Sequence, residues 1–164
     1  MHWIALQPAP DAHSDALADL HTALAWNALR FTPLVARVED ALVLEISASE
    51  RLFGGRAALV RLIYQQNKAL ARIQHAQGAT SLIALGRLWS ASAQSPVDAL
   101  PVKVLAAARP HLPTFSRLGV GSWGQLRALP RGGLVRRFGA GLVDALDQAY
   151  GQRAELYPWI TLPE

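Results

Sequence analysis

The chain changes character at residues 92–101, SAQSPVDALP, and this change constrains the fold more than any other feature of the sequence. Before this stretch, short apolar runs rich in β-branched residues alternate with longer segments of helical periodicity. After it, short helical segments follow one another, separated by Gly and Pro. We therefore expect an α+β protein. A β/α module at residues 1–97 would precede a small all-helical domain at 98–152, with a C-terminal linker at 153–164.

The β/α module is expected to alternate strands with helices. Apolar runs predict strands at 3–7, 34–38, 41–47 and 73–77. Periodic segments predict helices at 12–29, at 56–72 and after Gly78. Glu39 and Asp40 separate the second and third strand-like runs, which indicates a β-hairpin.

The helical part contains a glycine pair with a distinctive setting. Short helices are predicted at 103–108, 111–118, 134–138 and 141–150. Gly119, Val120 and Gly121 interrupt this series, and Ser122 follows as an N-cap with Gln125 at the capping-box spacing.

This order of residues has the shape of a helix-hairpin-helix, with Leu118 and Val120 anchoring the turn inward. Its glycines would let the backbone amides near Ser122 approach a phosphate. The alternative is a simple corner between two helices.

Charge is distributed unevenly. The net charge is +4, and residues 1–100 carry eight basic and eight acidic side chains. The excess therefore lies in residues 101–164, which favours a polyanionic partner, although a solvated basic surface would give the same count. Arg131, Arg136 and Arg137 follow the glycine turn and are candidate phosphate ligands. Phosphate contacts of this kind carry no base identity, so binding to a nucleic-acid backbone through them would have no sequence preference.

Several other classes of site are excluded or unsupported. The chain has no cysteine, so it forms no disulfide or thiolate metal site. No apolar run approaches the roughly 20 residues of a membrane span, and the N-terminus lacks the basic region of a signal peptide. We therefore expect a cytoplasmic location and no membrane partner. No P-loop spacing or metal-binding histidine pattern is present, so we expect no metal and no cofactor.

Three stretches resemble the translesion (Y-family) DNA polymerases. LGVGSWGQLRALPRGGLVRRFG, residues 118–139, resembles their thumb, and FTPLVARVEDALVLEISASERLFGG, residues 31–55, resembles their palm hairpin. MHWIAL resembles their first palm strand. The Leu-Phe-Gly-Gly element that closes the hairpin looks most like the variant found in ImuB proteins. The resemblance implies a reduced palm-like module, followed by a thumb-like domain with the helix-hairpin-helix.

The resemblance also implies that the catalytic carboxylates are missing. Two-metal catalysis needs several carboxylates to hold Mg²⁺. The acids of the first palm strand fall at Ala5 and Gln7, and those of the hairpin fall at Asp40 and Ala41. One surviving carboxylate does not assemble such a site, so we expect no enzymatic activity.

Two further departures from the family concern whole subdomains. Only about 20 residues separate the first strand from the helix before the hairpin, which leaves no room for the polymerase fingers. The little finger would follow the last residues of this sequence. The chain is therefore expected to be either a piece of a longer protein or a naturally short relative.

The function that the resemblance implies is a non-catalytic role in the SOS response to DNA damage. ImuB-type proteins act there with a RecA-like partner, ImuA, and an error-prone C-family polymerase. Their clamp-binding motifs lie in a C-terminal region that this sequence does not include, so we do not expect this chain to bind the sliding clamp. Two alternatives stay open: a protein-interaction module without DNA binding, and a residually active nucleotidyl transferase.

Overall fold

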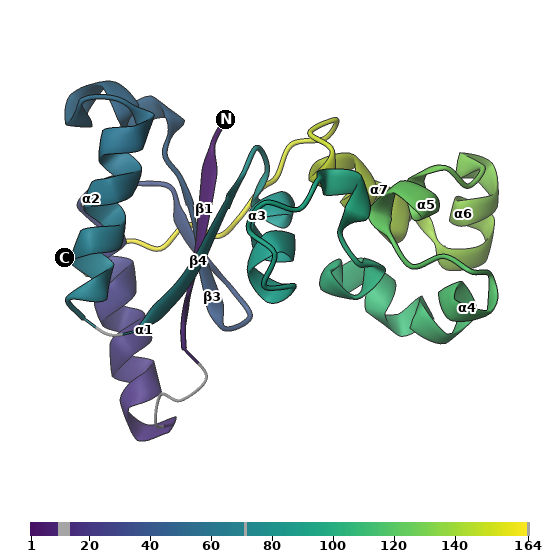
Figure 1. Ribbon diagram of the computed structural model, residues 1–164, viewed down its shortest axis with the longest axis horizontal. Coiled ribbons are helices and arrows are strands. Elements are labelled where there is room, and N and C mark those ends of the chain that lie inside the picture. Colours follow the sequence, from purple (N-terminus) through teal and green to yellow (C-terminus); the bar gives the residue numbers. More distant parts are fainter. Residues whose placement is uncertain (10–13, 71, 164) are drawn as a thin grey trace.

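The computed structural model describes residues 1–9, 14–70 and 72–163 and shows two lobes (Figure 1). One lobe is a small antiparallel sheet flanked by helices, and the other is entirely helical. The expected mixture of a small sheet with helices is confirmed. No helix in the described ranges is long and apolar enough to cross a membrane.

The sheet contains β1 (Trp3–Pro8), β2 (Val35–Val38), β3 (Ala41–Glu45) and β4 (Ile73–Gly78) in the order β2-β3-β1-β4. All of its pairings are antiparallel. Helix α1 (Ser14–Leu29) connects β1 to β2, and α2 (Arg56–Lys68) connects β3 to β4. The two crossovers interleave, which gives the split β-α-β order of ferredoxin-like sheets. The first two residues of the predicted helix 12–29 lie outside the described residues.

Helices α1 and α2 cover one face of the sheet. The alternation of side chains along β1 directs Ile4 and Leu6 to this face, where Leu42 and Leu44 of β3 join them. Side chains of α1 and α2 complete this core: Leu24, Ala25, Ala28, Leu59, Val60 and Ile63. The short 3₁₀ segment η1 (Ser47–Phe53) leads into α2, and Phe53 packs edge-on against Phe31.

Helix α3 (Ser81–Trp89) covers the opposite face. Thr80 caps it by accepting a hydrogen bond from the amide of Ile83 at 3.2 Å. This face is made mostly of small side chains, which let the helix approach closely: Ala5, Ala36, Ala41, Val43 and Ala76. Leu85 and Leu88 of α3 pack against them.

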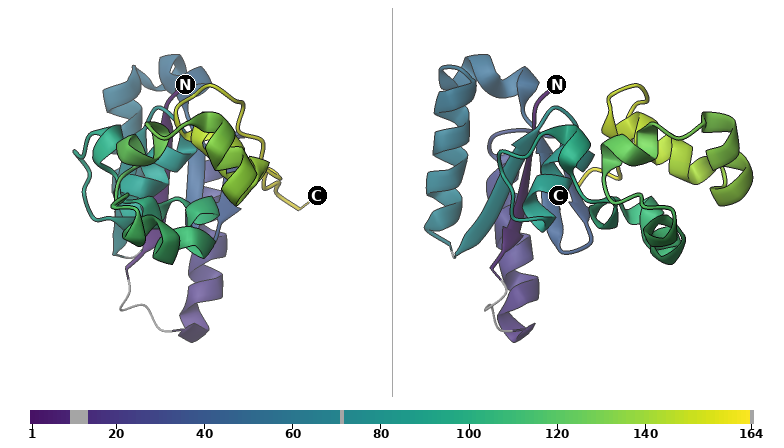
Figure 2. Two further views of the ribbon diagram at one scale, coloured as in Figure 1. Left: turned by 90° about the vertical axis from the view of Figure 1, so that its right-hand side faces the viewer. Right: turned by 45° about the vertical axis from the view of Figure 1, so that its right-hand side comes forward.

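The helical lobe stands on the α3 side of the sheet, away from α1 and α2 (Figure 2). It begins with 3₁₀ turns η2 (Val97–Ala99), η3 (Val102–Val104) and η4 (Ala106–His111), where an α-helix at 103–108 was predicted. Pro101 and Pro110 lack amide hydrogens, which explains why no longer helix forms here.

Four α-helices follow: α4 (Leu112–Arg117), α5 (Trp123–Arg127), α6 (Arg131–Phe138) and α7 (Ala140–Ala149). Trp123 and Phe115 are the largest buried side chains of the lobe.

Residues 155–160 pack against the sheet lobe. The sequence predicts a C-terminal linker at 153–164, so these contacts are a finding of the structure. The carboxylate of Glu155 accepts hydrogen bonds from the amide and hydroxyl of Ser81, at 3.0 and 2.7 Å. The ring of Trp159 stacks on Trp3 at 6.2 Å, and the amide of Ile160 donates to the carbonyl of Val35 on the edge strand at 2.8 Å. This segment therefore ties the end of the helical lobe back to the sheet.

Candidate nucleic-acid interface

The glycine turn joins α4 to α5 in a tight conformation. Gly119 has a φ of +73°, a value that favours glycine. The amides of Gly119 and Val120 donate to the carbonyls of Ser116 and Phe115, at 3.2 and 2.9 Å. Val120 is buried as expected, whereas Leu118 is 46% exposed. Only Val120 therefore anchors the turn, because the backbone bonds that close α4 turn Leu118 outward.

The capping box predicted at Ser122 is present. The hydroxyl of Ser122 accepts from the amide of Gln125 at 3.2 Å. In return, the Gln125 side-chain oxygen accepts from the amides of Gly121 and Ser122, at 2.8 and 3.3 Å. The two amides that the sequence assigned to a phosphate thus already have an acceptor. A phosphate that bound them directly would have to displace the exposed Gln125 side chain.

A hollow of about 480 Å³ lies beside the turn. It is lined by Val102, Leu112, Ser116, Gly119, Val120, Gly121 and Gln125. The turn is therefore accessible from solvent. The residues that line the hollow are apolar or small and polar, and none of them is charged.

The three arginines after the turn have different surroundings. Arg131 forms a two-pronged ion pair with Asp147, with nitrogen–oxygen distances of 2.9 and 2.6 Å. The hydrogen bond from Arg131 lowers the pKa of the Asp147 carboxyl. Arg136 and Arg137 are exposed and form no ion pair with any described residue. Arg131 therefore holds α6 against α7, whereas Arg136 and Arg137 have no such role.

The helical lobe as a whole is rich in positive charge. Residues 98–152 carry seven basic side chains and three acidic ones. Arg109 and Arg131 are paired with carboxylates. The other basic side chains form no ion pair within the described chain: Lys103, Arg117, Arg127, Arg136 and Arg137. Lys103, Arg117 and Arg127 were not singled out from the sequence, although the charge excess of this region was the signal that pointed to them.

The four positions assigned to lost catalytic acids do not share one open space. Ala5 and Ala41 are fully buried on the face that α3 covers. The side-chain oxygen of Gln7 accepts a hydrogen bond from the indole nitrogen of Trp89 at 2.9 Å. Asp40 lies in the exposed β2–β3 turn, 3.9 Å from Arg37. No group of three or more His, Cys, Asp or Glu side chains in the described ranges is arranged to hold a metal ion.

Contacts between the two lobes were not foreseen from the sequence. Arg109 of η4 forms an ion pair with Glu39 of the β2–β3 turn at 2.5 Å and lies over the ring of Trp89, 5.2 Å from its centroid. The hydroxyl of Thr80 donates to the carbonyl of Ala149 at 2.9 Å. An added Cβ on Gly86 would lie 3.2 Å from Trp123, so a side chain here would press α3 away from the helical lobe.

Comparison of the amino-acid sequence with curated proteins finds a match. The chain is 38% identical over 163 residues to the protein ImuB of Caulobacter vibrioides, in strain NA1000 and in strain ATCC 19089, and the match covers 90% of the chain. The resemblance to ImuB is confirmed. The chain spans only 33% of the length of these ImuB proteins. No family model matches the chain. No solved structure matches it either.

Proposed function

We propose that this ImuB-like chain is a non-catalytic DNA-binding scaffold of error-prone DNA damage tolerance, the SOS mutagenesis pathway. Its helical lobe binds the phosphate backbone of duplex DNA without sequence preference. One observation carries the proposal: five basic side chains of this lobe have no carboxylate partner in the described chain. Such charges attract the DNA backbone through counterion release, which needs no base contacts.

The glycine turn contributes less to the proposed DNA binding than the sequence indicated. The amides of Gly121 and Ser122 are held by Gln125, so arginines supply most of the attraction. Arg136 and Arg137 lie in the last turn of α6 and are the leading phosphate ligands. Arg131 acts by fixing α6 against α7 through Asp147.

The absence of catalysis is part of the same proposal. The positions where polymerases carry their first-strand and hairpin acids are Ala5, Gln7, Asp40 and Ala41 in this chain. Ala5 and Ala41 are core residues, and Gln7 is bonded to Trp89. A pair of Mg²⁺ ions needs several carboxylates in one solvent-accessible place. The sheet lobe would then serve as a scaffold for protein partners such as a RecA-like ImuA and an error-prone C-family polymerase.

Fluorescence anisotropy with a labelled DNA duplex tests the proposal. Arg136→Glu should weaken binding by roughly tenfold at low salt, because it replaces a phosphate ligand with a repelling charge. Arg61→Glu is the matched control, since Arg61 is also exposed but lies on α2 of the other lobe. Equal affinity of the two variants would contradict the proposal.

A second candidate, a protein-interaction module without DNA binding, is favoured by the occupied amides of the turn. It predicts no binding to duplex DNA even at low salt. The same titration therefore separates the two candidates.

A further inference from the structure

The two edges of the sheet have different surroundings. At the β2 edge, the amide of Ile160 donates to the outward carbonyl of Val35 at 2.8 Å. The other edge is β4, which pairs only with β1 among the described strands. Figure 1 shows β4 nearest the viewer, in front of β1. An edge strand presents backbone amides and carbonyls to which another extended chain can bond, so the β4 edge is open to a further strand.

The pairing of β1 with β4 determines which backbone groups of β4 point outward. The amide of Ala9 donates to the carbonyl of Arg72 at 2.9 Å, just beyond the end of β4. Bonded and non-bonded pairs alternate along an antiparallel ladder. Every second residue of β4 therefore bonds to β1, and the amides and carbonyls of Ile73, His75 and Gln77 point away from it.

Two of these three residues are available to a partner strand. The carbonyl of Gln77 accepts a hydrogen bond from the guanidinium of Arg87 at 2.9 Å. No described residue bonds to the outward amide or carbonyl of Ile73 or of His75. Together they offer two donors and two acceptors at the spacing with which an added strand pairs.

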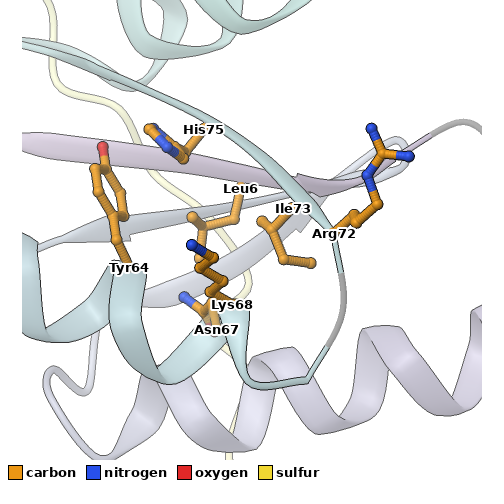
Figure 3. A pocket seen from close by; sticks show the side chains of 7 residues that line it. All are labelled: Leu6, Tyr64, Asn67, Lys68, Arg72, Ile73 and His75. Carbon is orange, nitrogen blue, oxygen red and sulfur yellow. The ribbon is translucent and has the colours of Figure 1, made fainter.

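A hollow lies on each side of this part of the edge. One, of about 490 Å³, lies between α2 and the sheet, and Figure 3 shows Tyr64 and Lys68 extending into it from α2. The other, of about 270 Å³, lies beside the end of α3. Ile73 and His75 line both hollows. Because side chains alternate between the two faces of a strand, an added strand would place successive side chains in the two hollows.

The charge near the edge favours an acidic partner strand over a second copy of this chain. Lys68 is exposed and forms no ion pair with a described residue. No residue that lines either hollow is acidic. A second copy of β4 would bring another Lys68 to the same interface, where like charges repel. A glutamate or aspartate of a partner strand would instead compensate Lys68.

We propose that the β4 edge binds an extended acidic segment of a partner protein, which adds a strand to the sheet. Its backbone pairs with the outward amides and carbonyls of Ile73 and His75. Its acidic side chains face Lys68, and apolar side chains alternate with them and contact Leu88 and Ala91 in the hollow beside α3. This surface suits the scaffold role proposed for the sheet lobe, but the inference rests on the strand edge and not on DNA binding by the helical lobe.

Hydrogen exchange followed by NMR, with and without a short capped peptide in which glutamate and valine alternate, tests the proposal. When the peptide is saturating, the amides of Ile73 and His75 should exchange roughly tenfold more slowly or less, because each gains a carbonyl acceptor. The amide of Gln74 is the internal control, since it faces β1 and should change little. Absence of peptide binding, or unchanged exchange at Ile73 and His75 in the bound state, would overturn the proposal.

Two N-methylated forms of the same peptide separate strand addition from simple attraction between charges. One form is methylated at the valine amides and the other at the glutamate amides. Because only one of these sets faces β4 in a bound strand, one form should bind roughly tenfold more weakly than the other. Equal affinities of the two forms would contradict strand addition.

A charge exchange tests the role of Lys68. Lys68→Glu should weaken binding of the glutamate peptide by about fivefold and strengthen binding of a peptide with lysine in place of glutamate. Arg61→Glu, on the same helix but outside the hollow, should leave both affinities nearly unchanged. Thermal melting verifies that both variants are folded. Equal affinities of the two variants for the glutamate peptide would show that Lys68 does not select an acidic strand.

Sedimentation of the chain without peptide distinguishes the two occupants of the edge. We expect a monomer. A dimer whose formation slows exchange at Ile73 and His75 would assign the edge to a second copy and overturn the acidic partner. Failure of duplex binding by the helical lobe would change none of these results.

Discussion

Two surfaces of this molecule have opposite surroundings: the α3-covered face of the sheet and the surface of α6. The α3-covered face of the sheet bears Ala5 and Ala41 in a closed apolar core. The surface of α6 bears Arg136 and Arg137, which are exposed and form no ion pair with a described residue. Around Ala5 and Ala41 the first surface presents no described acidic side chain to a metal ion, whereas the second offers positive charge to a polyanion. The sheet lobe and the helical lobe therefore differ in the side chains that these two surfaces present.

The largest effect is expected from returning an acid to the closed face. Ala5→Asp should destabilise the protein by about 3 kcal/mol or more, because Ala5 is fully buried between β3, β4 and α3. Urea denaturation followed by circular dichroism measures the change. Ala93→Asp, at an exposed position, is the control and should change stability little. If Ala5→Asp were as stable as the control and bound Mg²⁺, the face would be open and the comparison would fail.

A smaller effect is expected at the contact between the lobes. Arg109→Ala removes both the ion pair with Glu39 and the stacking on Trp89. The contact is partly exposed, so the loss of stability should be only about 1 kcal/mol.

The orientation of the lobes should change more clearly than the stability. The chain has no cysteine, so spin labels on Arg61→Cys and Ala140→Cys report one distance between the lobes. We expect Arg109→Ala to broaden the distribution of that distance. A distribution as narrow as that of the labelled parent would show that Arg109 does not fix the lobes.

The smallest effect concerns pH. His21 is buried, and neither ring nitrogen has a partner among the described residues. Burial, aided by the charge of Arg37, lowers the pKa of His21 below its ordinary value of 6.5. His21 therefore binds a proton more readily in the unfolded chain than in the folded protein. The stability contributed by neutral His21 is complete above pH 6.5 and is lost as the pH falls below that value.

Urea midpoints measured at pH 7.5 and pH 5 test this linkage. His21→Leu should reduce the difference between the two midpoints, because it removes one of the groups that take up a proton on unfolding. His75 has a pKa lowered by burial as well, so part of the difference should persist. An unchanged pH dependence in His21→Leu would show that His21 does not contribute.

Local features of the fold were predictable because they depend on neighbouring residues. The hairpin around Glu39 and Asp40 and the capping box formed by Ser122 and Gln125 follow from short spacings, and the structure contains both. The strand order was not predictable, because it depends on pairing between β1 and β4, which are far apart in the sequence.

The candidate interface was predictable only in part, for the same reason. Charge located it in the helical lobe, but the pairing of Arg131 with Asp147 joins residues 16 positions apart. Likewise, residues 155–160 show neither strand nor helix periodicity. Their packing on Trp3 and Val35 could therefore not be predicted from the spacing of apolar residues.

The salt dependence of duplex binding tests the central claim most directly. We predict that the logarithm of the association constant falls linearly with the logarithm of salt concentration, with a slope of about −0.9 for each phosphate neutralised. The double variant Arg136→Glu, Arg137→Glu should give a slope shallower by about 2 units, whereas Arg61→Glu should keep the parent slope. A slope near zero, or the same slope in the parent and the double variant, would contradict the account.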